Sequence, residues 1–114
     1  MLPYSYQAKN NSNIAKFADT AIYKLVEEME KLGAHRASIV AKLAGGAQMF
    51  AFESSNELMR IGYRNAAAAR EILEQLGIPV VAEDTGGNTG RTMILDLETG
   101  NVFIRMVGKE PKLL

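Results

Sequence analysis

The sequence predicts an α/β fold, a layered sandwich with a mixed sheet, made of two α–β units followed by a β-hairpin. Three observations support this expectation. Two amphipathic helical patterns each end at a glycine, each precedes a short apolar strand that runs into paired glycines, and two strand-like segments then flank a turn sequence. Helices and strands in this order pack as layers around one core. The length of 114 residues fits a single domain, residues 1–114.

The first helical pattern begins near Ile14. Apolar residues recur at steps of three or four and predict an inward stripe, widened by Ile22 and Val26, while charged residues take the opposite face. The predicted stripe consists of Phe17, Ala21, Leu25, Met29 and Leu32. Gly33 is the predicted C-cap, because glycine tolerates the left-handed turn that ends many helices. The polar residues 1–13 lack periodicity and predict a surface loop.

The second unit repeats this order of elements. A short apolar run at residues 38–44 predicts a largely buried strand that ends at Gly45 and Gly46. The second helix is predicted over residues 62–76 and closes at Gly77. Its inward face is expected to consist of Ala66, Ala69, Leu73 and Leu76, with Ile72 beside them.

A second strand and a hairpin are predicted to follow. Residues 79–84 form the strand, which runs into Gly86 and Gly87, and two β-rich segments then flank a turn at residues 98–101. The glycine-rich loops after the two predicted strands are expected at one edge of the sheet. Open α/β sheets favour ligands at such an edge.

Composition excludes several classes of function. The chain has no cysteine, which excludes disulfides, thiolate metal sites and a cysteine nucleophile within it. A single histidine, His35, does not suit a histidine-rich metal centre, and we expect neither a metal nor a cofactor. Thirteen basic residues balance thirteen acidic ones, so nothing indicates binding to nucleic acid or to an anionic membrane. No apolar run reaches the length of a membrane span and no signal peptide is recognisable, so we expect a cytoplasmic protein.

Residues 82–92, AEDTGGNTGRT, resemble two known site motifs. The letters D-T-G at residues 84–86 match aspartic proteases, but those enzymes pair two carboxylates, and a retropepsin of this length is almost all β. A phosphate loop requires G-x-x-x-x-G-K-[ST] before a helix, whereas Arg91 stands in place of the lysine and a predicted strand follows. A structural interpretation is also open, in which the glycines and Asn88 supply positive φ to a tight connection.

Residues 44–52, AGGAQMFAF, place Met49 and Phe50 after paired glycines in a predicted loop. These side chains either fold back over the core or form an exposed apolar surface for a partner, and both interpretations stay open. His35 lies in another predicted loop and is expected to be solvated.

Four segments together resemble the CheD family of chemoreceptor glutamine deamidases. They are KFADTAIYKLVEEMEKLGA, VAKLAGGAQMF, RIGYRNAAAAREIL and IPVVAEDTGGNTGRT, and the similarity runs from Met1 to about Val107. The resemblance implies an α/β sandwich related to toxin deamidases. It also implies an enzyme that hydrolyses glutamine side chains of methyl-accepting chemotaxis receptors to glutamate and ammonia, through a cysteine nucleophile and a histidine. The implied partners are the receptors and, in some species, the phosphatase CheC.

The chain departs from the family pattern at the catalytic residues. The family cysteine lies in a G-S-C segment and the histidine in an H-x-M-L-P segment, whose end matches Met1, Leu2 and Pro3. Both residues are therefore expected upstream of Met1, and His35 does not match the catalytic histidine. We expect an N-terminally truncated CheD-like domain that is inactive by itself. An engineered truncation, a start codon assigned too late, proteolysis and a shortened inactive paralogue all stay open as causes.

Loop placement within this resemblance gives the candidate binding residues. The substrate cleft is expected to be formed by Gly45, Gly46, Asp84, Thr85, Gly86, Gly87 and Asn88. Asp84 has an alternative structural role, bonded to loop amides. Met49 and Phe50 are expected to contact the receptor helix. Two functions stay open: a receptor glutamine deamidase, and an inactive CheD-like binding module for receptor helices or CheC.

Overall fold

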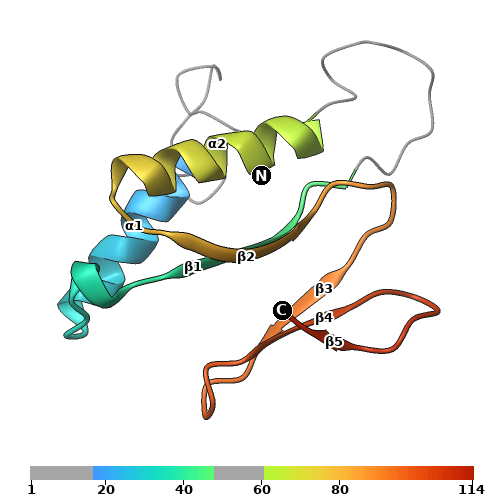
Figure 1. Cartoon of the computed structure of the whole chain (residues 1–114). Helices are drawn as coiled ribbons and strands as arrows, with labels where there is room; N and C mark the ends of the chain where they lie inside the picture. Colours follow the sequence, from blue (N-terminus) through green and yellow to red (C-terminus); the bar gives the residue numbers. More distant parts are fainter. Residues whose placement is uncertain (1–16, 48–60) are drawn as a thin grey trace.

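The computed structural model describes residues 17–47 and 61–114 (Figure 1). In chain order the elements are α1 (Ala18–Lys31), a 3₁₀ turn (Arg36–Ser38), β1 (Ala41–Gly45), α2 (Ile61–Gln75), β2 (Val80–Thr85), β3 (Thr92–Leu95), β4 (Val102–Arg105) and β5 (Lys112–Leu113). Two α–β units followed by a hairpin confirm the predicted α/β class. The strands of the described residues form two sheets, β1-β2 and β3-β4-β5.

The parallel pair β1–β2 forms the layer under the helices. Its register pairs Ala41 with Val80 near one end and Gly45 with Thr85 at the other. Helix α2 contacts both strands, and α1 contacts α2 (Figure 1). Each strand follows its own helix after a short connection, so the two strands run in the same direction. Their carboxyl ends therefore meet at one edge of the sheet.

An apolar core lies where α1, α2 and the starts of the two parallel strands meet. It consists of Val26, Ile39, Leu73 and Ile78. Burial of an aliphatic side chain of this size contributes roughly 1.5–3 kcal/mol. This cluster therefore fixes the position of both helices over the sheet.

Both helices end in the same glycine-dependent motif. At the end of α1, Gly33 has a φ of +103° and Ala34 N donates to Met29 O at 3.0 Å. At the end of α2, Gly77 has a φ of +72° and Ile78 N donates to Leu73 O at 2.9 Å. The predicted C-caps are confirmed. The pattern is that of a Schellman motif, in which left-handed glycine returns the chain toward the next strand.

The predicted inward face of α1 is partly wrong. Leu25 and Leu32 are 60% and 89% exposed, whereas Val26 and Ala18 are buried. The stripe that faces the core passes through Ile22, Val26 and Met29, so the two residues predicted only to widen the stripe lie at its centre. The predicted start near Ile14 and the predicted loop at residues 1–13 lie outside the described residues.

The first strand and the inward face of α2 also differ in detail from the prediction. Residues 36–38 form a 3₁₀ turn, so the first strand begins at Ala41 rather than at residue 38, and Val40 is exposed. Strand β1 is half-buried rather than largely buried, since one of its edges carries no partner strand within the described residues. On α2, the fully buried residues are Ala68, Ala69, Ile72 and Leu73, while Ala66 and Leu76 are half-buried.

The predicted hairpin is confirmed by the antiparallel pairing of β3 with β4. Asp96 N donates to Asn101 O at 2.9 Å and Gly100 N donates to Asp96 O at 2.7 Å, which closes the turn. Val102 and Ile104 lie on the inner face of β4 and are buried. Strand β5 adds to the other edge of β4 and was not predicted, because a strand of two residues carries no recognisable alternation.

Two lysines connect the sheets. Lys42 on β1 donates through Nζ to Leu114 O at 2.7 Å, and Lys112 Nζ lies 2.6 Å from Asp84 Oδ2 on β2. The end of the second sheet is thereby linked to both strands of the first. Neither described helix is long and apolar enough to cross a membrane.

Candidate functional site

The two glycine loops meet at the carboxyl edge of the parallel pair, as the sequence predicts. Gly45 lies opposite Thr85 in the register, and Gly86 N donates to Gly45 O at 3.0 Å. Gly46 and Gly86 have φ values of +67° and +82°, a region that other residues rarely adopt. Glycine at both positions lets the two segments that follow β1 and β2 turn away from the sheet while a backbone hydrogen bond still joins them.

Helix α2 begins directly over the end of β1. A Cβ atom added at Gly46 would lie 2.8 Å from Gly62 O, and one added at Gly62 would lie 2.5 Å from Gly46 O. Real Cβ atoms do not approach a carbonyl oxygen this closely, so the contact requires glycine on both sides. The first turns of α2 are therefore held close above the two loops.

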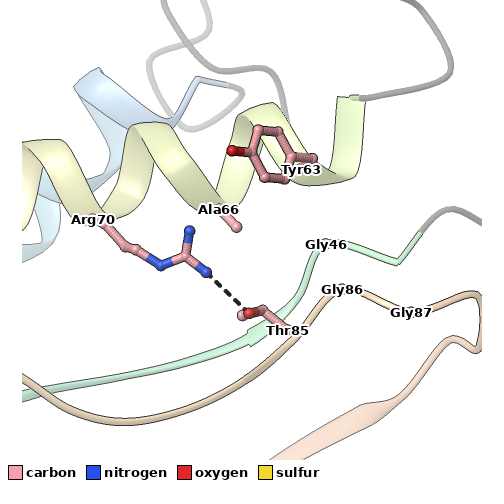
Figure 2. A pocket seen from close by; sticks show the side chains of 7 residues that line it. All are labelled: Gly46, Tyr63, Ala66, Arg70, Thr85, Gly86 and Gly87. Atoms are coloured by element: carbon pink, nitrogen blue, oxygen red, sulfur yellow. Dashed lines mark hydrogen bonds between the residues drawn. The ribbon is translucent and has the colours of Figure 1, made fainter. Parts of the chain in front are cut away.

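A pocket of about 410 Å³ opens between α2 and these loops (Figure 2). It is lined by Gly46, Tyr63, Ala66, Arg70, Thr85, Gly86 and Gly87. Four of these, Gly46, Thr85, Gly86 and Gly87, belong to the predicted cleft. Tyr63, Ala66 and Arg70 were not predicted as site residues, although their spacing of three and four places them on one face of α2.

Two residues of the pocket lining, Arg70 and Thr85, form a hydrogen-bond network with Glu83 on β2, which lies behind the lining. Arg70 donates from Nε and Nη2 to Glu83 Oε1 at 3.0 and 2.5 Å, and from Nη2 to Thr85 Oγ1 at 3.0 Å. Thr85 Oγ1 in turn donates to Glu83 Oε1 at 3.0 Å. The hydrogen bonds from Arg70 and then from Thr85 lower the pKa of Glu83, and Glu83 raises the pKa of Arg70. Both side chains of the pair are therefore charged at neutral pH.

Asp84 faces away from this pocket and is nearly buried. Its Oδ1 accepts from Arg91 Nη1 at 2.5 Å, and its Oδ2 lies 2.6 Å from Lys112 Nζ. The hydrogen bond from Lys112 is the main cause that lowers the pKa of Asp84, and the charge of Arg91 adds to it against the opposing effect of burial. The geometry favours the structural interpretation of Asp84, with two cationic side chains as its partners in place of the expected loop amides.

Arg91 fastens the loop that carries the paired glycines. Its guanidinium donates to Asp84 O at 2.7 Å, to Gly86 O, and to Thr89 O at 3.1 Å. One buried side chain thus holds three carbonyl oxygens of the connection between β2 and β3. Sequence reasoning noted Arg91 only as a departure from the phosphate-loop motif and missed this role.

The remaining candidates lie away from the pocket. Asn88 is exposed, and its Oδ1 accepts from Thr89 Oγ1 at 3.3 Å. His35 is exposed at the start of the 3₁₀ turn, as expected. Met49 and Phe50 lie outside the described residues. The connection after β2 leads into β3 rather than into a helix, which excludes the phosphate-loop interpretation.

Comparison with known proteins identifies the family of this chain. The sequence matches the family model described as CheD chemotactic sensory transduction over residues 1–106. The chain belongs to the CheD family. Membership excludes the aspartic-protease interpretation of D-T-G, and the motif serves here as the end of β2 and the start of a glycine loop.

Curated members of the CheD family are similar over nearly the whole chain. A relative from Lachnoclostridium phytofermentans is 54% identical over 112 residues, which cover 98% of this chain and 70% of the relative. A relative from Moorella thermoacetica is 55% identical over 115 residues, with coverage of 100% and 69%. A relative from Caldanaerobacter subterraneus is 52% identical over 108 residues, with coverage of 95% and 67%. Each carries the name probable chemoreceptor glutamine deamidase CheD.

Proposed function

We propose that this CheD family member acts as a chemoreceptor glutamine deamidase. Such an enzyme hydrolyses receptor glutamine side chains to glutamate and ammonia. The observation that carries the proposal is the match over residues 1–106, together with relatives more than 50% identical that are named for this activity. In this proposal the protein works in the cytoplasm, on the cytoplasmic part of the receptors.

In this proposal the pocket at the carboxyl edge of β1 and β2 receives the substrate side chain. Gly46, Gly86 and Gly87 present backbone rather than side chains, so a receptor helix can approach the loops closely. Thr85 and the face of α2 supply the polar and apolar contacts. Arg91 and Asp84 support the loop from behind, and Asn88 lies at its exposed tip.

Amide hydrolysis by the family chemistry needs a thiolate and a histidine within reach of the carboxamide. The 114 residues contain no cysteine. We propose that the nucleophile and its base belong to a segment upstream of Met1. The present residues then form the substrate-binding part of a larger CheD domain.

Mass spectrometry tests this function directly. A cytoplasmic receptor fragment is incubated with the protein isolated from its source cells, and each deamidated glutamine adds about one dalton to its peptide. A mass gain at specific glutamines is the expected result. A folded protein that contains cysteine and produces no gain would contradict the proposal.

The missing cysteine also favours a second candidate, an inactive CheD-like module that binds receptor helices or CheC. This candidate predicts saturable binding without any mass gain. Titration of the chain with a receptor fragment, and separately with CheC, measures that binding. A flat response with both partners would exclude it.

A further inference from the structure

We propose that Glu83 and Thr85 make the pocket between α2 and the glycine loops selective for an uncharged carboxamide side chain over a carboxylate. This inference rests on the proposed function, because the occupant is the substrate glutamine of a receptor helix. The disfavoured side chain is the glutamate that the reaction produces. Glu83 and Thr85 are thus specificity-determining residues.

The first part of the argument concerns the charge of Arg70. This side chain lines the pocket, and a lone guanidinium there would attract carboxylates strongly, often with two parallel hydrogen bonds. Glu83 instead occupies Nε and Nη2 of Arg70, with its Oε2 also 3.2 Å from Nε. Glu83 therefore occupies the Nε–Nη2 edge of the guanidinium and Thr85 accepts from Nη2 as well, so a carboxylate cannot bind that edge with two parallel hydrogen bonds. The pair also brings the net charge of this wall to zero.

The second part concerns the hydroxyl group of Thr85. Its proton goes to Glu83 Oε1, and one of its lone pairs accepts from Arg70 Nη2 (Figure 2). A hydroxyl has one donor and two lone pairs, so the remaining capacity of Thr85 is that of an acceptor. A carboxamide nitrogen carries two N–H donors that suit this lone pair. A carboxylate carries none and would meet an acceptor with an acceptor.

The third part concerns the rest of the lining. The methyl group of Ala66 and the ring of Tyr63 face the pocket from α2, and the opposite side is glycine backbone (Figure 2). These surfaces suit the methylene groups of a glutamine side chain, and the volume of about 410 Å³ admits it. After hydrolysis, the new carboxylate lacks the donor for Thr85, and the wall offers it no net positive charge because Glu83 neutralises Arg70, which favours release of the product.

The test compares two forms of one receptor cytoplasmic fragment, with glutamine or with glutamate at the modified positions. Dissociation constants are measured by calorimetry for the wild-type chain, Glu83→Gln and Glu98→Gln. The wild type is expected to bind the glutamine form more tightly. Glu83→Gln is expected to shift the ratio of the two constants toward the glutamate form by roughly two- to fivefold, the size of a partly exposed charge interaction. Glu98→Gln removes the same charge from the β3–β4 turn and should leave the ratio unchanged.

Two further variants locate the binding site. Thr85→Val keeps the shape but removes the acceptor, so the preference for glutamine should fall toward equal binding. Ala66→Phe fills the pocket and should weaken binding of the glutamine form severalfold, with far-ultraviolet circular dichroism as the check of folding.

The outcomes separate the inference from the proposed function. An unchanged ratio in both Glu83→Gln and Thr85→Val would overturn the inference. Wild-type affinity in a folded Ala66→Phe variant would also overturn it, while receptor binding itself would stand. Absence of binding to either fragment by the wild-type chain would overturn the inference, whereas the mass-spectrometric assay would still decide the deamidase activity.

Discussion

Arg91 and Asp84 form an ion pair with Nη1 and Oδ1 2.5 Å apart, and their side chains are only 4% and 12% exposed. The same guanidinium holds carbonyl oxygens at both ends of the glycine loop. The loop that forms the floor of the pocket is thus fixed from its buried side. Its shape depends on a residue that is not part of the pocket lining.

The first prediction concerns Arg91. Arg91→Met should lower the free energy of unfolding by about 2–4 kcal/mol, because it leaves Asp84 and the loop carbonyls without their buried donor. Urea denaturation followed by circular dichroism measures the change. Arg105→Met is the matched control: Arg105 is exposed at the end of β4, and its substitution should change stability by less than about 0.5 kcal/mol. Similar losses in the two variants would contradict the role given to Arg91.

The second prediction concerns the pH dependence that Asp84 produces. Its pKa is lowered in the folded state by Lys112 and Arg91, so folding favours the ionised carboxylate. The resulting stability is fully present above the ordinary value of 3.8 and is lost as the pH falls through the lowered pKa. Asp84→Asn should therefore be less stable than the wild type at neutral pH, and the difference should shrink on acidification. Urea midpoints across the acid range measure it, with Glu98→Gln as the control; a constant difference at all pH values would exclude this linkage.

The third prediction separates steric from conformational effects at glycine. Gly46 and Gly77 have similar φ values of +67° and +72°, but only Gly46 faces a backbone atom at 2.8 Å, since a Cβ at Gly77 would meet nothing within 4 Å. Gly77→Ala should cost about 1 kcal/mol from the left-handed conformation alone. Gly46→Ala should cost about 1–3 kcal/mol more, because α2 must shift away from the loop. Thermal unfolding of the two variants compares them, and equal costs would show that the contact with Gly62 is not tight.

The fourth prediction tests the face of α1 that packs on the core. Val26→Ala should lower stability by about 1–2.5 kcal/mol, since it removes two buried methyl groups beside Leu73 and Ile78. Leu25→Ala, one position away on the same helix, should change stability by less than about 0.5 kcal/mol. Urea denaturation of both variants checks this order. The reverse order would instead support an inward face of α1 that is centred on Leu25.

Much of the fold could be predicted because glycines indicate where the helices end and where the loops after the strands begin. Gly33 and Gly77 identify the helix ends, and the paired glycines after each strand identify the loops that meet at one edge. The phase of α1 was less predictable, since Leu25 and Val26 are both apolar and only the position of α2 decides which of them is buried. Strand β5 is too short to show a pattern.

The site was predictable at its loops but not on its helical side. Tyr63 and Arg70 enter the pocket only because Gly46 and Gly62 bring α2 close to β1, and this approach depends on tertiary contact. The pairing of Arg70 with Glu83 likewise joins a helix to a strand across thirteen positions. A sequence lists both charges without indicating that they neutralise each other at a pocket wall.

The ion pair between Lys112 and Asp84 has a consequence for folding during translation. Synthesis runs from the N-terminus, so α1, β1, α2 and β2 are all made before Lys112. Until β5 has joined the sheet, Asp84 lacks the side chain that contributes most to its lowered pKa. The carboxylate acquires its full electrostatic environment only when the last strand pairs with β4, so the end of the chain completes the support of the glycine loop.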